Sequence, residues 1–531
     1  MERTHADARE LARLRYELAR LRDRRTVRAA LAVTALQRGG RTGGLGGVRD
    51  ALRGRSPRID MPGPVHAPPH TPYPQLRMAV IGPGDLVDGA VAWQPLAPQD
   101  AVTLIDRDRP DVLLVRDPTG WRPTDLDAAV GAVRGHGGAV VTTPDADAAV
   151  ASPDLCFDPP GAVDVRRWSP VGLDDTGEAV VRRDAARLGP EEARHQPVVV
   201  VEDPSRVTTR RVLELCSAGA VVVATATPAL ERAFAGLADR DRDAILAPEP
   251  RAGEGAGSAR ATRAGITARV EALLADDDAR RRLSVRLRRH VHTARSTQAS
   301  VVDLVTALDR FPAPDTSITA LLATRRPARL PQVLSDLERQ HHDDVEVVVL
   351  LHTDEAVPDR LLDRRCVRVV ERVPAHRPLG AVLDHGLAHA RGHAIAKVDD
   401  DDRYGPDHLG DLLLSLQVSG AEVVGRRVHG VFLEDGAVTL HPPPGGEERF
   451  EDHLPGATML VRGEVLRTLR WRHVATGVDT ELVRAVHLAG GSAYTAHRYG
   501  FVRGRHHDHT YDAAGWRGRA VPGFDTTLLE A

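Results

Sequence analysis

Cysteine, lysine and long apolar runs are all scarce in this chain of 531 residues. Its three cysteines, Cys156, Cys216 and Cys366, are scattered and form no Cys-x-x-Cys pair, so they indicate neither disulfides nor zinc. No segment approaches the roughly twenty apolar residues that a helix needs to cross a bilayer, and no signal peptide opens the chain. The net charge is only −3, and we expect no nucleic-acid partner. These features predict a multidomain enzyme of the cytoplasm.

The single lysine, Lys397, stands two residues before a run of acids. The apolar segment 394–398 is typical of a strand, and the four aspartates 399–402 follow it. Such a run of carboxylates is costly to build without a counter-ion. Because side chains alternate along a strand, Asp399 and Asp401 can converge on one divalent metal while the other two aspartates point elsewhere. The pattern therefore predicts a metal clasp.

Carboxylate oxygens suit Mg²⁺ or Mn²⁺, and these ions usually keep open positions that substrate phosphates fill. A metal and nucleotide site is the hypothesis that follows. Two plainer interpretations stay open. The segment 404–408 is typical of a turn into a helix, whose N-terminus some of the acids would complement. Lys397 can be ordinary variation at a strand end, or a point charge near phosphate.

The surroundings of the acid run alternate strands with helices. Apolar segments at 316–323, 345–351 and 367–370 predict strands, and a helix is expected over about 330–339. This alternation favours a largely parallel sheet in an α/β fold. Ligands of such sheets bind beyond the carboxyl ends of the strands, where the turn after 316–323 and the acid run would lie.

The region 316–515 resembles the family 2 glycosyltransferases, whose domain has the GT-A fold. The resemblance rests on segments spread from Thr324 to Leu482. They are Thr-Arg-Arg-Pro at 324–327, the stretch 379–392, Val-Asp-Asp-Asp-Asp at 398–402, Pro-Asp-His-Leu at 406–409, Gly-Ala-Thr-Met-Leu at 456–460, and Gly-Val-Asp-Thr-Glu-Leu at 477–482.

This resemblance implies transfer of a sugar from a nucleotide diphosphate to an acceptor hydroxyl, with inversion and without an enzyme nucleophile. Asp479 matches the family's general base. Asp399 and Asp401 match its metal-binding positions, and the ion would stabilise charge on the leaving phosphate. The implied contacts to the nucleotide sugar are Thr324, Arg326, Asp354, Lys397, Asp399 and Asp400.

Two positions depart from the family pattern. The second strand ends in Leu-Leu-His-Thr-Asp, where only Asp354 can replace the usual acidic turn that reads the nucleobase. Val478 replaces the Glu that usually precedes the catalytic Asp. Late in the chain, the His-rich segment 503–511 provides His509 as a further metal ligand or diphosphate contact, unless this segment is only a solvated polar loop.

The preceding region 76–310 carries a second pattern. A strand at 197–202, a helix at 208–219 and a strand at 220–225 resemble the GT-B-like domain of CgeB-like spore-protein glycosyltransferases, and the segment 266–290 matches its closing part. The resemblance implies that Glu214 binds the donor ribose, with Arg210 or Arg211 near phosphate. Apolar runs further upstream indicate short Rossmann-type α/β units. Either a structural or acceptor-guiding domain or a second active transferase would fit.

Both ends of the chain differ from these domains. Leu11, Leu14, Leu18 and Leu21 predict an amphipathic helix within 1–38, which would allow a homo-oligomer through a short coiled coil. Its excess of Arg is compatible with peripheral binding to anionic lipid or with a polyanionic acceptor, although a solvated basic helix is commoner. A Gly, Pro and Arg linker is expected at 39–75, and a tail at 516–531.

Two classes of function remain at this point. The favoured one is a metal-dependent inverting glycosyltransferase acting on a glycan or cell-envelope glycoconjugate at the cytoplasmic side of the membrane. A non-catalytic glycan- or nucleotide-binding scaffold is the rival, and an enzyme with two transferase domains is a nearer alternative. The presence of both Asp401 and Asp479 favours an enzyme, because a scaffold needs no base.

Overall fold

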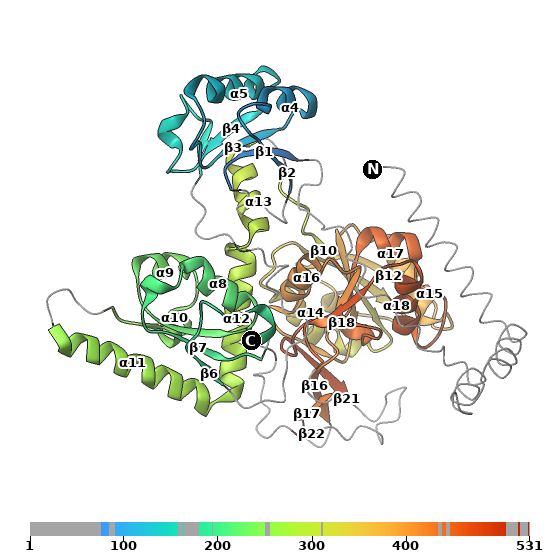
Figure 1. Ribbon diagram of the computed structural model, residues 1–531. Helices are drawn as coiled ribbons and strands as arrows, with labels where there is room; N and C mark the ends of the chain where they lie inside the picture. Colours follow the sequence, from blue (N-terminus) through green and yellow to red (C-terminus); the bar gives the residue numbers. More distant parts are fainter. Residues whose placement is uncertain are drawn as a thin grey trace, which may run out of the picture.

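The computed structural model describes residues 76–83, 91–157, 163, 180–193, 195–249, 255–309, 312–433, 438–441, 446–505, 519–520 and 529. Across these residues the strands form four sheets, in an α/β arrangement (Figure 1). The helix predicted at 1–38, the linker at 39–75, His509 and most of the tail at 516–531 lie outside the described residues. None of the helices in the described ranges is long and apolar enough to span a membrane.

The first sheet is entirely parallel, in the order β2-β1-β3-β4-β5. Its short strands are apolar and buried on both faces, as expected when helices cover both sides. The elements are β1 (Arg77–Ile81), β2 (Ala92–Pro95), α4 (Ala101–Asp108), β3 (Val112–Val115), α5 (Pro123–Gly135), β4 (Ala139–Thr142), η1 (Asp147–Ala149) and β5 (Leu155–Cys156).

The second sheet, β6-β7-β8-β9, is also parallel and Rossmann-like. Its central strands are nearly pure valine, which suits a sheet buried on both faces. Gly219, with φ +107°, allows the tight turn from α8 into β8. The elements are β6 (Val181–Arg182), α7 (Pro190–Ala193), β7 (Val198–Val201), η2 (Pro204–Arg206), α8 (Thr209–Ser217), β8 (Val221–Thr225), α9 (Pro228–Ala233), α10 (Asp239–Ile245), β9 (Leu246–Ala247), α11 (Gly255–Ala275) and α12 (Asp277–Ala294).

Helix α13 (Thr297–Ala307) returns the chain to the first sheet. Its Val301, Leu304 and Val305 belong to the same buried cluster as Leu76 and Met78 of the first domain. In Figure 1, α12 and α13 run one after the other along the boundary between the domains. The first domain is therefore completed by a helix that follows the whole second domain in sequence.

The C-terminal domain is built on an eight-stranded sheet with the order β12-β11-β10-β13-β19-β15-β20-β18. The four strands β12, β11, β10 and β13 are parallel, while β19 is antiparallel to both of its neighbours. The strands are β10 (Ile318–Thr324), β11 (Val345–Leu351), β12 (Val367–Arg372), β13 (Ala394–Asp399), β15 (Val423–Gly425), β18 (Arg449–Glu451), β19 (Leu460–Arg462) and β20 (Ala493–Thr495).

Helices cover both faces of this sheet. Ile318, Ala320 and Leu322 of β10 pack in one cluster with α14 and α16, while Leu321 packs on the opposite side with α15, α17 and α18. The bounds are η3 (Pro327–Arg329), α14 (Leu330–Glu338), η4 (Asp359–Leu361), α15 (Leu379–Leu387), α16 (His408–Ser419), η5 (Gly456–Thr458), α17 (Gly463–Leu469) and α18 (Val478–Leu488).

A smaller sheet, β14-β21-β16-β17-β22, starts immediately after the acid run. The antiparallel pairing of Tyr404 with Phe501 joins β14 to β21, so late residues return beside the aspartates. The sequence analysis did not predict this sheet. Its strands are β14 (Arg403–Tyr404), β16 (His429–Leu433), β17 (Val438–His441), β21 (Phe501–Arg505) and β22 (Arg519–Ala520).

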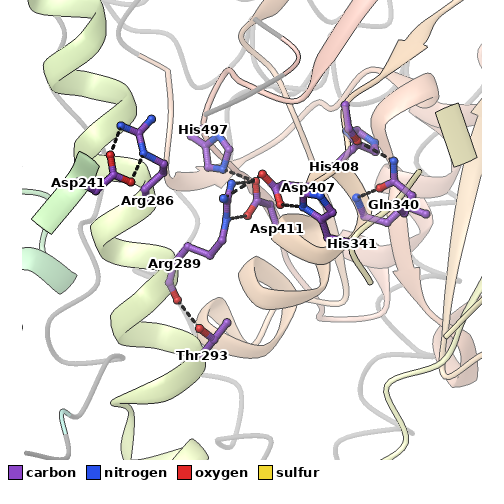
Figure 2. A network of polar contacts seen from close by, with 12 residues as sticks. Asp241, Arg286, Arg289, Thr293, Gln340, His341, Asp407, His408, Asp411 and His497 are labelled. Atoms are coloured by element: carbon purple, nitrogen blue, oxygen red, sulfur yellow. Dashed lines mark hydrogen bonds and ion pairs between the residues drawn. The ribbon is translucent and has the colours of Figure 1, made fainter. Parts of the chain in front are cut away.

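The second and third domains are joined by ion pairs between α12 and α16. Arg289 donates to both carboxylate oxygens of Asp411, at 2.7 and 3.0 Å, and its guanidinium lies 2.9 Å from Asp407 (Figure 2). His497 lies 3.0 Å from the same Asp411 carboxylate. Burial opposes the charged form of Asp411, but Arg289 and His497 hold its pKa well below the usual range.

Candidate active site

Two side chains at the carboxyl end of β10 contact the acid run. The Thr324 hydroxyl donates to Asp400 Oδ2 at 2.5 Å. The Arg326 guanidinium donates to Asp400 Oδ1 at 2.5 Å and to Asp401 Oδ2 at 2.6 Å. This meeting follows from the sheet, because β10 and β13 are adjacent parallel strands in which Ala323 pairs with Asp399. Asp400 is turned inward by these contacts, with a side chain only 5% exposed.

Asp399 is the most accessible carboxylate of the run, with 37% of its side chain exposed. The Lys397 ammonium donates to its carboxylate. Burial disfavours the charged form of Asp399, yet Lys397, Arg503 and Arg326 hold its pKa below the usual range. Its backbone N–H donates to the Tyr404 hydroxyl at 2.9 Å, which fixes the end of β13.

Asp402 is buried behind the other acids and accepts the backbone N–H of Gly504 at 3.0 Å. Burial is the main cause that raises its pKa to about 8; Arg503 opposes the rise, and the charges of Asp401 and Asp399 add to it.

Three positive charges face the four carboxyl groups, so full ionisation of the run would leave one negative charge without a partner. Arg326 and Lys397 contact the run directly, and Arg503 acts on it through its charge. Carboxylate oxygens are the donors that Mg²⁺ and Mn²⁺ prefer. Asp399 and Asp401 therefore offer the oxygen ligands and the negative charge that a hard divalent cation needs. Asp399 is also exposed enough for an ion to reach it.

Asp479 lies in the first turn of α18 and is oriented by backbone groups. Its Oδ2 accepts the N–H of Gly456 at 3.0 Å, and its Oδ1 accepts the N–H of Thr480 at 2.9 Å. A Cβ on Gly456 would lie only 3.0 Å from Oδ2, so glycine permits this approach. The next residue, Ala457, accepts the Tyr404 hydroxyl at 3.3 Å. Thus η5 is the short bridge between Asp479 and the end of β13.

At the end of β11, Asp354 is exposed to solvent, and its predicted contact with the nucleobase stays a prediction. The polar contacts there belong to His352, which is 3% exposed. Arg325 donates to His352 Nδ1 at 3.1 Å, and His352 Nε2 lies 2.8 Å from the carbonyl oxygen of Arg377. Burial chiefly, with the charge of Arg325, lowers the pKa of His352. Sequence reasoning gave no role to this Arg–His pair, although both residues follow adjacent strands.

In the second domain, Glu214 and Arg211 face each other on α8. Arg211 Nη1 donates to Glu214 Oε2 at 3.0 Å, and Arg210 Nε donates to Oε1 at 3.3 Å. Arg211 also donates to the carbonyl oxygens of Ala185 and Leu188. These contacts join α8 to the segment before β7. The predicted roles of Glu214 and Arg211 toward a donor remain predictions.

Sequence reasoning also gave no role to Tyr404 and Arg503. The Tyr404 side chain connects β13 to η5, and it is fully buried between them. A Tyr two residues after an acid run was the available signal. Arg503 comes close only through the pairing of β21 with β14, which depends on contacts between distant parts of the sequence.

The fold and the site define an α/β domain with an acidic edge at the carboxyl ends of its parallel strands. More particularly, residues 321–468 match the family described as Glycosyl transferase family 2. The C-terminal region therefore carries a family 2 glycosyltransferase domain of the GT-A type. The match does not extend to the N-terminal half, so the CgeB-like resemblance there stays a prediction. No curated protein matches the chain.

Solved structures of TarS from S. aureus are similar to part of the chain. TarS 1–349 in complex with UDP-GlcNAc is 14% identical, with a TM-score of 0.30, and the match covers 36% of this chain and 60% of that one. TarS 1–349 in complex with UDP is 14% identical with a TM-score of 0.29, covering 36% and 60%. The longer TarS structure is 14% identical with a TM-score of 0.29, covering 36% and 37%. The chain thus spans less than two thirds of each TarS structure.

Proposed function

We propose that the C-terminal domain is a metal-dependent inverting glycosyltransferase. It transfers a sugar from a nucleotide-diphosphate donor to a hydroxyl of a glycan or cell-envelope glycoconjugate. The observation that carries this proposal is the joining of Asp479 to the acid run through η5, within a domain that matches family 2. Direct displacement of a sugar from a phosphate requires a general base and, close to it, carboxylates that bind a metal cation. Here the two stand on neighbouring segments.

Each residue has a distinct role in this reaction. Asp399 and Asp401 hold Mg²⁺ or Mn²⁺, which would supply Lewis-acid stabilisation of the leaving diphosphate. Arg326 is bound to Asp400 and Asp401, so it orients them and lies ready to contact phosphate. Asp479 removes the proton from the attacking acceptor hydroxyl as the new glycosidic bond forms and the bond to the phosphate breaks.

Three further residues assist donor binding in this proposal. Thr324 fixes Asp400, and Lys397 balances the charge of Asp399. Asp354, exposed beyond β11, is available to the nucleobase. We also propose His509 as a contact to metal or diphosphate, on the sequence pattern alone.

The N-terminal half supports a second, weaker proposal. Two successive parallel sheets, with α13 returning to the first, are compatible with a GT-B-like arrangement. However, Glu214 is already bonded to Arg210 and Arg211. We therefore propose a structural or acceptor-guiding role for this half rather than a second transferase.

Thermal unfolding with nucleotides tests the main proposal. The protein is heated with UDP, dTDP, GDP or CDP, each with and without Mn²⁺. A nucleotide at a hundred times its dissociation constant should stabilise the domain by about 2.7 kcal/mol. We expect one nucleotide to raise the Tm only when Mn²⁺ is present, and Asp401→Ala to abolish this effect.

Asp343→Ala is the matched control, because Asp343 is an exposed acid of the same domain away from the sheet edge. It should keep the full effect of nucleotide and metal. If no nucleotide stabilises the wild-type protein, the donor site is not functional and the scaffold alternative replaces the enzyme.

A further inference from the structure

A second cluster of potential metal ligands lies on another part of the C-terminal domain. Glu371 at the end of β12, His385 in α15 and His389 just after α15 each offer one ligand atom, and these atoms all lie within 4.8 Å of one another. The His385 Nε2 atom is 3.4 Å from Glu371 Oε2, and His389 Nε2 is 3.6 Å from Glu371 Oε1. In the described part of the chain, these three residues form the group of His, Cys, Asp or Glu side chains whose ligand atoms are close enough to hold a metal ion.

The fold explains why these three side chains meet. In the pairing of β11 with β12, Leu350 lies opposite Glu371. Gly386 of α15 lies directly over Leu350, and a Cβ there would meet Leu350 Cδ1 at 2.6 Å. The glycine thus lets the helix approach the sheet beside Glu371. His385 and His389, four residues apart, stand next to this contact on one side of the helix end.

The distances suit a tetrahedral ion. Ligands about 2.0–2.1 Å from zinc in a tetrahedron are about 3.3 Å apart. Each imidazole is near that distance from a different oxygen of Glu371, at 3.4 Å for His385 and 3.6 Å for His389, and one ligand atom of each residue lies within 4.8 Å of the others. The two imidazole rings have centroids 5.5 Å apart. Two imidazoles and one carboxylate form a ligand set that zinc accepts, with water in the fourth position.

The charge environment also favours a cation. Many acids among the described residues pair with guanidinium groups, as Asp384 does with Arg470 at 2.8 Å. Among the described residues, the partners of the Glu371 carboxylate are instead the two imidazoles. All three side chains are partly exposed, at 45% for His385, 32% for His389 and 33% for Glu371, so an ion can enter from solvent.

We propose that Glu371, His385 and His389 form a Zn²⁺ site that clamps the edge strand β12 to the end of α15. Imidazole ligands select zinc over Mg²⁺ and Mn²⁺, which prefer oxygen. The site is therefore distinct from the acid run in both position and metal preference. Its role is structural, because the ion would cross-link the edge strand β12 to the C-terminal end of α15. The N-terminal end of α15 begins just after Arg377, whose carbonyl oxygen contacts His352.

Zinc binding to tag-free protein tests this proposal. Equilibrium dialysis against buffered Zn²⁺, in an excess of Mg²⁺ that occupies oxygen-only sites, is followed by metal analysis. His506, His507 and His509 can also bind zinc, so the readout is the difference between variants. We expect His385→Gln/His389→Gln to bind one equivalent fewer than wild type, with affinity at this site lowered by more than about 100-fold.

His473→Gln is the matched control. His473 lies 3.3 Å from Asp384 in a similar imidazole and carboxylate pair that lacks a third ligand. It should keep the full zinc stoichiometry, and Glu371→Gln should lose the same equivalent as the double variant. Circular dichroism checks that each variant is folded. Equal zinc content in wild type, the double variant and Glu371→Gln would overturn the proposal.

The outcome is separable from the proposed transferase activity. Asp401→Ala should still bind the zinc equivalent, and the double His variant should still respond to nucleotide with Mn²⁺. If Asp401→Ala loses the zinc equivalent while His385→Gln/His389→Gln keeps it, the ion belongs to the acid run and the separate site is contradicted.

Discussion

The second domain and the C-terminal domain each carry a cluster of charged side chains beside a parallel sheet, and the two clusters differ in charge balance. In the second domain, Glu202 pairs with Arg183, and Glu214 pairs with Arg210 and Arg211. In the C-terminal domain, the four carboxyl groups of the acid run face three cations, Arg326, Lys397 and Arg503. Balanced charges hold helices and strands together, whereas an excess of one sign indicates a ligand of the other sign.

The largest effect expected is on catalysis at the unbalanced site. Asp479→Asn should lower kcat by about 10²–10⁴-fold, because an amide cannot accept the acceptor proton. The stabilisation by nucleotide and Mn²⁺ should be unchanged, since Asp479 lies beyond η5 from the acid run. Release of nucleoside diphosphate measures the rate. The neighbouring Thr480→Ala should be nearly silent, and a normal rate in Asp479→Asn would remove its role as base.

The contact between the two regions should show the next largest effect, on stability. Asp411→Ala leaves Arg289 and the buried Arg426 without their shared carboxylate. Loss of one partner of a buried ion pair costs about 3–5 kcal/mol, and urea unfolding would measure it. Asp407→Ala should cost about 1 kcal/mol or less, because Arg289 keeps Asp411. Equal losses in both variants would mean that the α12–α16 contact is not a buried network.

Acid should weaken the second domain through His292. Burial, and then the charge of Arg288, lowers its pKa from 6.5 to about 3. Between these values the unfolded chain binds a proton that the folded chain does not, so stability falls as pH drops below 6.5. The loss is about 1.4 kcal/mol per pH unit, or roughly 2 kcal/mol by pH 5.

The check is urea unfolding of wild type and His292→Gln at pH 7 and pH 5. Gln can keep the hydrogen bond that His292 makes with the Ser217 hydroxyl at 3.0 Å. The wild type should lose more stability on acidification than the variant by that amount. The same pH dependence in both proteins would show that His292 accepts a proton in the folded state.

The smallest effect is expected at the balanced site. Glu214→Ala should leave the transferase rate within about twofold and cost about 1 kcal/mol or less in stability, as partly exposed ion pairs do. Activity assays with each candidate donor would measure the rate, and urea unfolding would measure the stability. Loss of one activity while another persists would place a donor at Glu214, and the two regions would then both be catalytic.

The sequence predicted the strands of the parallel core well because each is a continuous apolar run. Segments 316–323, 345–351 and 367–370 lie in or largely overlap β10, β11 and β12. The antiparallel β19 and the small sheet were missed, since their strands are short and pair across long separations.

Within the candidate site, alternation predicted that neighbouring aspartates diverge. It could not predict that Asp400 and Asp401 share Arg326, because that depends on where the turn after β10 lies. The α12–α16 contact was also missed. Arg289 and Asp411 are far apart in sequence and belong to different domains, so no local pattern relates them.

The return of α13 to the first sheet has a consequence for biosynthesis. The first domain is discontinuous in sequence, since Val301 and Leu304 complete a core that includes Leu76 and Met78. At a synthesis rate of about 5–20 residues per second, roughly 7–30 s pass between emergence of β5 and of α13. During that interval one face of the first sheet stays uncovered while the second domain is made. The nascent chain should therefore be most prone to chaperone binding before residue 307 leaves the ribosome.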